Sequence, residues 1–426
     1  MDFVSKSQSS GIVADLSKHT VVTAVEDAAM PSAAACAPTR SYQNGAAYFQ
    51  VNLLTCFVDF CPGKQAYDTL VVSFEGAGPP FERPDGTRDG FGTKFLTDSG
   101  YSVLAFKPKI VNWYRSPDVV EYFKFLAASR FFHGFSNVVF TGGSMGGYAS
   151  LAFSAVHPGS TIVAIQPQST LAPHIVPWED RWNYGRQYDW HGPFADAIDS
   201  TRLAKRVIVA YDPMLKQDAM HVHRLDQHNI FHVQLPFVGH KVGGAMRDAG
   251  VLKDFTRWSI NGELDHEKCR HIRKSCRAST AYYEGAIPAL MRRQRKKAVA
   301  ALLKHAPLNY EEFPRAWMAA SQYYSAVGEI AFADRQWKAV AKGNSRNARL
   351  GIGCVRYLAE TGRTERASAR LAWLLERAVD KAFVRSWAET NAPKLNLVYS
   401  PVDIAATDAA TNPGEAAVQP NEMVER

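Results

Sequence analysis

The sequence lacks any long apolar run: nothing in it approaches the roughly 18 consecutive apolar residues that a membrane-spanning helix needs. It also shows no basic segment followed by an apolar core of signal-peptide length. Hydrophobic residues make up 46% of the 426 residues and charged residues 21%, which is a globular composition. We therefore expect a cytoplasmic protein rather than a membrane-spanning or exported one.

Cysteine is scarce, and its spacing argues against two kinds of site. The six cysteines show no paired CxxC spacing, so neither a disulfide framework nor a zinc site is indicated. Nucleotide-binding motifs are missing as well, because TGGSMGG at 141–147 lacks the Lys-Ser/Thr of a phosphate loop and no GxGxxG follows the first apolar run. We expect no metal and no organic cofactor.

Acidic residues are nearly missing from one segment. Between Lys268 and Lys297, ten Lys or Arg residues stand against a single acidic residue, Glu284, which more than accounts for the net charge of +8. Such a basic segment can bind an anionic polymer or a membrane surface, although it is more often a solvated helix face. We expect no specific nucleic-acid binding.

Short apolar runs separated by helix-length spacers are plentiful. Runs that are apolar on both faces and bounded by Gly, Pro or Asp are typical of a parallel sheet covered by helices on both sides. The fold class is therefore α/β. The expected strands are residues 69–76, 101–108, 137–143, 161–167, 206–212 and 231–240, with further edge strands within 45–60.

Changes in composition divide the chain. We expect a flexible arm over 1–40, the α/β domain over 41–260, a smaller all-α domain over 261–400 and a disordered tail over 401–426. In the helical part, Gly328 and Gly362 lie 34 residues apart (362 − 328). This spacing resembles the tetratricopeptide repeat, a helix-turn-helix unit, and the resemblance implies a surface for a protein partner.

One serine directly follows an apolar run. Ser144 lies in Gly-Gly-Ser-Met-Gly, residues 142–146, between the expected strand 137–143 and a helical pattern. This GxSxG match is weak alone, because Gly and Ser are common in turns. The strand-to-helix context strengthens it, since a serine on a sharp turn needs small neighbours and presents its oxygen above the sheet. Such a nucleophile requires a histidine base held by an acid.

Both partners follow downstream. Asp212 ends one expected strand and His240 follows the next. The alternative acid is Asp218, whose other possible role is to cap a helix; the position of Asp212 at the strand end favours Asp212. The order Ser, Asp, His, each beyond its own strand, resembles the α/β-hydrolase superfamily over roughly residues 65–258.

The resemblance implies an oxyanion hole and a cap. Its donors would be the backbone N–H of Met145 and that of Gly76 or Ala77, in a loop where many relatives carry His-Gly-Gly-Gly and this chain has Glu75. The insertion at about 167–200 would form a cap whose side chains either line the substrate pocket or pack in the cap's own core. The candidates for substrate binding are Trp178, Trp182, Tyr188 and Trp190, with Arg181 and Arg186 for an anionic group.

The leading hypothesis is a serine hydrolase of the carboxylesterase type. It would cleave a small-molecule, glycan or lipid acyl ester through Ser144, His240 and Asp212, by way of a covalent acyl-enzyme. Two alternatives remain open. One is acyl transfer to a sugar or lipid hydroxyl by the same residues, and the other is a non-catalytic scaffold or assembly factor acting through its helical repeats.

Overall fold

The computed structural model describes residues 36–41, 47–63, 68–77, 86, 88–225, 228–305, 314–343 and 346–398. Most of the expected arm and the whole expected tail lie outside these residues, although 36–40 belong to a strand. The chain separates into two compact units, Met1–Gln294 and Arg295–Arg426. The expected boundary near residue 260 thus falls inside the first unit, because helices beyond it pack against the sheet with Ile272 and Ala281 buried in the core.

One mixed sheet forms the centre of the first unit. Among the described residues it has nine strands in the order β1-β2-β3-β5-β4-β6-β7-β8-β9. The six strands from β5 to β9 in that order are parallel, and β1, β2 and β3 form an antiparallel edge. The strands are β1 Cys36–Ser41, β2 Ala47–Asn52, β3 Cys56–Cys61, β4 Thr69–Phe74, β5 Ser102–Pro108, β6 Asn137–Gly143, β7 Thr161–Ile165, β8 Arg206–Tyr211 and β9 Ile230–Gln234.

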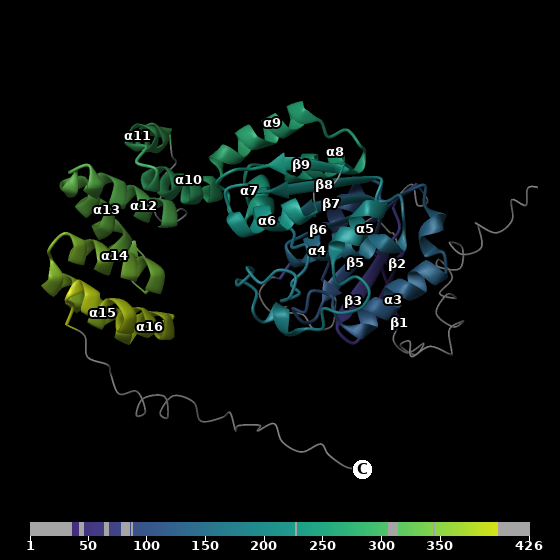
Figure 1. Ribbon diagram of the computed structural model, residues 1–426, viewed down its shortest axis with the longest axis horizontal. Helices are drawn as coiled ribbons and strands as arrows, with labels where there is room; N and C mark the ends of the chain where they lie inside the picture. The colour runs from purple at the N-terminus through teal and green to yellow at the C-terminus, as the bar shows by residue number, and fades with distance from the viewer. Residues whose placement is uncertain are drawn as a thin grey trace, which may run out of the picture. The chain divides into compact units, whose positions relative to one another are not determined.

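Both faces of this sheet are buried, as its uninterrupted apolar runs predict. In β4, Leu70 and Val72 enter one core cluster while Val71 between them enters the other, because alternate side chains point to opposite faces. Helices α3 and α4 cover the first face and α2, α7, α8 and α9 the second (Figure 1). The helices are α2 Thr93–Asp98, α3 Pro117–Ala128, α4 Met145–Ala152, α5 Ala197–Leu203, α6 Lys216–Arg224, α7 Val242–Asp248, α8 Leu252–Ile260, α9 His266–Ser275 and α10 Thr280–Arg292.

The expected fold class is confirmed. A mostly parallel sheet is flanked by helices and followed by a helical region, and the serine turn, the acid candidates and the histidine follow β6, β8 and β9 as in an α/β-hydrolase fold. No helix within the described ranges is both long and apolar enough to cross a membrane.

The second unit consists of helices among its described residues. They are α11 Lys296–His305, α12 Pro314–Ala326, α13 Ile330–Gly343, α14 Ala348–Glu360, α15 Thr364–Arg377 and α16 Lys381–Asn391. The starts of α11, α13 and α15 are each 34 residues apart (330 − 296 and 364 − 330), and those of α12 and α14 are too (348 − 314). The sequence period therefore corresponds to helix pairs.

The turns between these helices repeat in atomic detail. Gln294, Gly328, Gly362 and Asn396 all have positive φ, and each is 34 residues from the next. After Gly328 and after Gly362, the following amide bonds to a carbonyl five residues back, Glu329 to Tyr324 and Arg363 to Leu358. This is the helix-ending motif that a left-handed residue allows. The same backbone termination thus recurs once per repeat.

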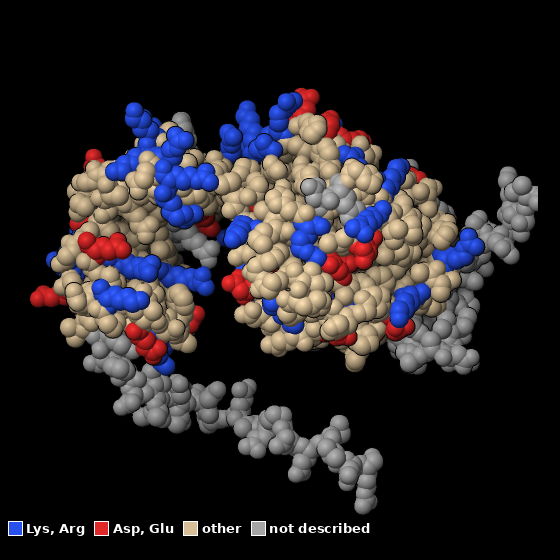
Figure 2. All heavy atoms as spheres, viewed as in Figure 1, with Lys and Arg blue, Asp and Glu red and all other residues tan. Residues whose placement is uncertain are grey.

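The basic segment 268–297 spans α9, α10 and the first residues of α11, and so extends from the first unit into the second. Its cations on α9 are exposed, and Figure 2 shows Lys and Arg side chains gathered over this helix. Arg270, Lys274 and Arg277 follow helical spacing along one exposed face. Contact with an anionic polymer or a membrane surface stays a prediction.

Candidate active site

Ser144 occupies a strained turn between β6 and α4. Its φ of 55° and ψ of −117° lie outside the regions that a residue with a side chain normally adopts. The turn is closed by small residues: a Cβ on Gly142 would collide with the Gly146 carbonyl, and one on Gly146 with the Phe74 carbonyl. The glycines at these two positions of the GxSxG motif therefore have a steric reason, and the turn holds the serine hydroxyl beyond the sheet edge.

A hydrogen-bonded chain runs from this serine. Ser144 Oγ lies 2.8 Å from His240 Nε2. On the other side of the ring, His240 Nδ1 lies 3.0 and 2.8 Å from the two carboxylate oxygens of Asp218. The Asp218 side chain is only 1% exposed. Because a carboxylate accepts, Nδ1 carries the proton and Nε2 is left to accept from the serine hydroxyl.

The structure places Asp218, and not the favoured Asp212, on the histidine. Asp212 instead accepts hydrogen bonds from the backbone N–H groups of Met214 at 2.7 Å and Gly239 at 2.6 Å. Burial raises the pKa of the Asp212 carboxyl, and these backbone bonds oppose the rise. Asp212 therefore ties the turn after β8 to the loop that carries His240, and the preference for it as the partner of the histidine was wrong.

Asp218 reaches the histidine from inside a helix. It is the third residue of α6, whose N-cap position is taken by Leu215, so Asp218 does not serve as the cap that the alternative interpretation assigned to it. Its carboxylate lies in the first turn, where the helix dipole favours negative charge. His221, one turn further along, is equally buried. Both side chains lie on the face of α6 that contacts the 167–200 insertion.

Gln166 fixes the backbone around His240. Its Nε2 donates to the His240 carbonyl at 3.3 Å, and its Oε1 accepts from the Gly243 N–H at 3.1 Å. Gln166 itself has a φ of 42°, a second strained residue at this edge of the sheet. The sequence analysis did not single it out. Its position at the end of the β7 run was the only available signal.

The candidate oxyanion donors lie beside the serine. Met145 is the first residue of α4, where a backbone N–H has no acceptor within the helix. A Cβ on Gly76 would lie 3.0 Å from the Gly143 carbonyl oxygen and 4.0 Å from Ser144 Cβ, so this loop packs directly against the turn. Ala77 follows it and is partly buried. The structure thus brings all three residues to the sheet edge that carries Ser144.

Glu75, where many relatives have histidine, anchors this loop. Its carboxylate is held by two nitrogens of the Arg88 guanidinium. Its backbone N–H donates to the hydroxyl of Tyr114 at 2.9 Å, and the same hydroxyl lies 3.0 Å from the Glu75 carbonyl oxygen. Tyr114 and its neighbour Trp113 both have positive φ. The loop is therefore braced by strained residues that sequence patterns did not reveal.

The four aromatic candidates of the insertion fall into different places. The Trp182 ring centroid lies 5.4 Å from that of His240, so this residue is at the site. Trp178 packs on His221 with ring centroids 4.6 Å apart. Tyr188 is 37% exposed. Trp190 is 3% exposed and lies 5.2 Å from the Tyr148 ring, so it packs in the core and its expected role in substrate binding is not supported.

The two arginines expected to meet an anionic group are engaged within the chain. Arg186 donates to the backbone carbonyls of Val176 and Glu179. Arg181 donates to Asp218 at 2.8 Å and to Glu179. A third arginine, Arg115, donates to three carbonyls of the insertion at 2.9 to 3.0 Å. These arginines fix the fold of the insertion, and the expectation of an anion site was wrong.

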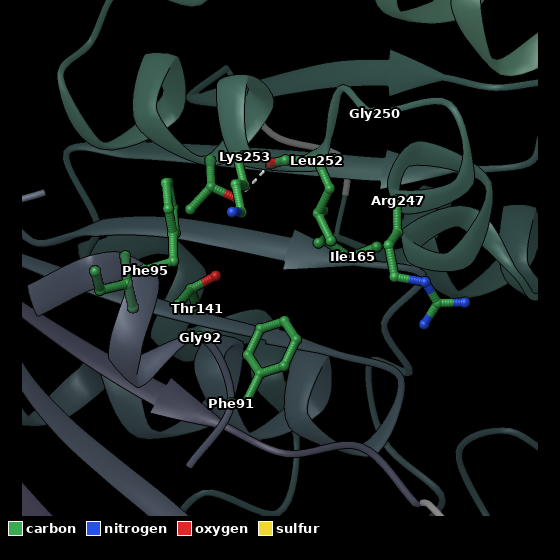
Figure 3. Close-up of a pocket in the computed structure, with 11 residues that line it drawn as sticks. Phe91, Gly92, Phe95, Thr141, Ile165, Arg247, Gly250, Leu252 and Lys253 are labelled. Carbon is green, nitrogen blue, oxygen red and sulfur yellow. Dashed lines mark hydrogen bonds between the residues drawn. The ribbon is translucent and has the colours of Figure 1, made fainter. Parts of the chain in front are cut away.

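A separate cavity lies on the sheet face opposite α4. Its volume is about 470 Å³. Figure 3 shows Thr141 and Ile165 of the sheet at its floor and side chains of α2, α7 and α8 around it, among them Phe95, Leu252 and Arg247. Among the described residues that line it, none belongs to the chain from Ser144 to Asp218. The candidate active site is therefore a different place.

Comparison with known proteins gives structural likenesses only. No protein-family model matches the chain, and no curated protein matches it by sequence. Similar solved structures include a capsule O-acetyltransferase of Neisseria meningitidis serogroup A, at 15% identity and a TM-score of 0.35, covering 52% of this chain and 96% of that one. Another is FphF, a fluorophosphonate-binding serine hydrolase of Staphylococcus aureus, at 12% identity and a TM-score of 0.36, covering 53% and 100%.

A third similar structure is carboxyl esterase 2 of the mycorrhizal fungus Tuber melanosporum. It shares 15% identity and a TM-score of 0.35, over 63% of this chain and 98% of that one. At such scores these likenesses carry no argument about what the chain does. The functional argument has to come from the geometry around Ser144.

Proposed function

We propose that the protein cleaves an acyl ester with Ser144 as nucleophile, His240 as general base and acid, and Asp218 as the carboxylate that orients the histidine. One observation carries the proposal. The Ser144 hydroxyl, on a strained strand-to-helix turn, lies 2.8 Å from a histidine nitrogen whose other ring nitrogen is bonded to a buried carboxylate. This is the arrangement that activates a serine at neutral pH.

The reaction would proceed in two steps. In the first, His240 Nε2 takes the hydroxyl proton as Ser144 Oγ bonds to the carbonyl carbon, and the N–H of Met145 with that of Gly76 or Ala77 stabilises the oxyanion. The bond to the leaving alkoxide then breaks as His240 returns the proton to it. In the second step, His240 deprotonates a water that attacks the acyl-serine, and the acid is released.

Activity on a panel of acyl esters tests this proposal. We expect measurable turnover of an activated ester such as p-nitrophenyl acetate by the full-length protein. Ser144→Ala should abolish that turnover while leaving the thermal unfolding midpoint within a few degrees of the wild type, because a small hydroxyl is removed. Turnover that survives Ser144→Ala in the purified protein would sink the assignment.

Product analysis separates hydrolysis from its alternatives. If an added sugar or lipid alcohol becomes acylated at the expense of free acid, the second step is acyl transfer and the same residues serve it. If no ester of the panel is cleaved and Ser144 reacts with no acyl donor, the α/β unit acts as a scaffold.

We further propose that α11–α16 are tetratricopeptide-like repeats that offer a surface to a protein partner. The 34-residue recurrence of helix starts and of left-handed turn residues supports this. Substitution of exposed residues on α14 should then weaken partner binding without changing ester cleavage. A partner that binds equally well to residues 1–294 alone would contradict the assignment.

A further inference from the structure

The carboxylate that orients the histidine is shared with a cation. Asp218 Oδ1 accepts from His240 Nδ1 at 3.0 Å and also from Arg181 Nη1 at 2.8 Å. Asp218 is 1% exposed and the Arg181 side chain 21%. A buried carboxylate beside a guanidinium is largely neutralised, and by itself such a pair would give an imidazolium little stabilisation.

A second carboxylate restores the missing charge. Glu179 accepts from the Arg181 Nε at 2.9 Å and from its backbone N–H at 2.9 Å, and its side chain is fully buried. Burial alone would raise the pKa of Glu179, but hydrogen bonds from His221 and Arg181 outweigh burial and lower this pKa to about 2. Glu179 is therefore ionised at neutral pH.

His221 completes this group without adding charge. The Ser169 backbone N–H donates to His221 Nδ1 at 3.1 Å, so the proton of the neutral ring is on Nε2, which donates to Glu179 at 3.1 Å. Burial lowers the pKa of His221 and keeps the ring neutral. Glu179, Arg181 and Asp218 together thus carry one net negative charge.

The other charged groups nearby are paired among themselves. Asp212, in the turn after β8, bonds to two backbone amides. Arg224 of α6 pairs with Asp196 at 2.7 Å and contacts Ser169. Lys241, next to the histidine, pairs with Glu284 at 3.0 Å. The charge that faces His240 is therefore set chiefly by the Glu179–Arg181–Asp218 group.

We propose that Arg181 and Glu179 are positioning residues of the active site. Arg181 binds the orienting carboxylate and Glu179 returns to it the one negative charge that a protonated His240 requires. Both residues come from the 167–200 insertion, whereas Asp218 comes from α6. The insertion thereby supplies the electrostatic surroundings of the catalytic histidine as well as a wall of the site. This inference rests on the proposed function, since it assumes that His240 is the base.

Charge-changing variants test it through the pH dependence of Ser144 labelling by a fluorophosphonate. Removal of a buried charge a few ångströms from a titrating group shifts its titration by about one pH unit or more. Glu179→Gln leaves no net charge in the group, so His240 loses its proton more easily and the acid limb of the rate profile should move down. Arg181→Met leaves two negative charges and should move the limb up.

The double variant makes the test specific. Glu179→Gln with Arg181→Met again leaves one negative charge, on Asp218, and should return the limb to within a few tenths of a pH unit of the wild type. A merely structural role predicts that the double variant is damaged at least as much as either single one. Asp59→Asn is the matched control, because Asp59 is a fully buried carboxylate paired with Lys107 and belongs to the β-sheet away from Ser144. It should cost stability and leave the limb in place.

The outcomes separate this inference from the proposed function. Opposite shifts in the single variants and recovery in the double variant support it. An unmoved limb in Glu179→Gln and in Arg181→Met, with Ser144 still labelled in a His240-dependent manner, overturns the inference and leaves the proposed function standing. Absence of labelling in the wild type, or labelling that His240→Ala does not diminish, removes both.

Discussion

At the scale of single residues, two aspartates divide two roles between them. Asp218 holds the imidazole of His240, and Asp212 binds the backbone of the loop that carries it. The sequence could not separate them, because both follow β8 within seven residues and the choice depends on side-chain direction. The turn Asp-Pro-Met-Leu intervenes and carries the chain to the start of α6 before a carboxylate faces the histidine.

Ester turnover distinguishes the two aspartates. We expect Asp218→Asn to lower kcat by roughly 10³- to 10⁴-fold, because an amide in this place no longer holds the correct tautomer of the imidazole. Asp212→Asn should lower kcat far less, since the amide oxygen still accepts one of the two backbone bonds. Steady-state kinetics of the two variants, with thermal unfolding as a check on folding, measures this. Equal losses of kcat would contradict the assignment of Asp218.

Residues that brace the site from a distance were not predictable. Gln166 clamps the His240 loop, Tyr114 binds the backbone of Glu75, and Arg181 contacts Asp218 across 37 residues of sequence. Each belongs to a residue type that is common on protein surfaces, and none forms a motif with its neighbours in the chain. Their function depends on tertiary contacts, which one sequence does not contain.

At the scale of elements, the sheet was predicted well and the insertion was not. The expected strand 137–143 coincides with β6, and the other parallel strands agree to within a few residues, because their apolar runs end sharply at Gly, Pro or Asp. The insertion has few such signals. Trp190 looked like a pocket residue by composition, yet its indole N–H donates to the Gly185 carbonyl in the interior.

The link between the insertion and α6 should weaken in acid. The pKa of Glu179 is about 2 in the folded chain, against its ordinary 4.5, since hydrogen bonds from His221 and Arg181 outweigh burial. A lowered pKa stabilises the fold above 4.5, and this stabilisation is lost as the pH falls from 4.5 to 2. The loss is at most roughly 3 kcal/mol.

Urea unfolding at several pH values checks this expectation. The wild-type free energy of unfolding should fall through that window more steeply than that of Glu179→Gln, which has no carboxylate to protonate. Asp59→Asn serves again as a buried control. Parallel slopes for wild type and Glu179→Gln would show that Glu179 is not held ionised by its partners.

The repeated turns of the second unit make a separate prediction. Gly362 has a φ of 77°, and a Cβ there would meet no atom within 4 Å, so substitution carries a conformational cost without a steric one. Gly362→Ala should destabilise the helical unit by about 1 kcal/mol, and Gly362→Asn by less, because asparagine tolerates the left-handed region better. Thermal unfolding of residues 295–426 within the full chain measures both. Equal stability of wild type and Gly362→Ala would contradict the turn geometry.

At the scale of the whole molecule, the proposed chemistry resides in one unit. Ser144, His240 and Asp218, with every residue found to brace them, lie within residues 1–294. The sequence placed the division near 260, because apolar strand runs stop there. Compositional change marks the end of the strands and not the end of the core, which continues through α10 with Ala286 and Ile287 buried.

Truncation tests this division. A chain ending at Gln294 should fold and keep Ser144 reactivity within about twofold of the full protein, because its core and site are complete, whereas a chain ending near residue 260 should lose both through the exposure of buried apolar surface. Circular dichroism and fluorophosphonate labelling of the two truncated chains decide it. Loss of reactivity in the 1–294 chain would show that the second unit contributes to the site.

The central claim is that Ser144 is a nucleophile activated by His240. Its most direct test is the site and rate of fluorophosphonate labelling in the folded full-length protein, with the modified peptide identified by mass spectrometry. The account predicts a single label on Ser144, loss of more than about 10³-fold in rate in His240→Ala, and no label after unfolding. A label elsewhere, or a Ser144 label whose rate does not change in His240→Ala, would contradict it.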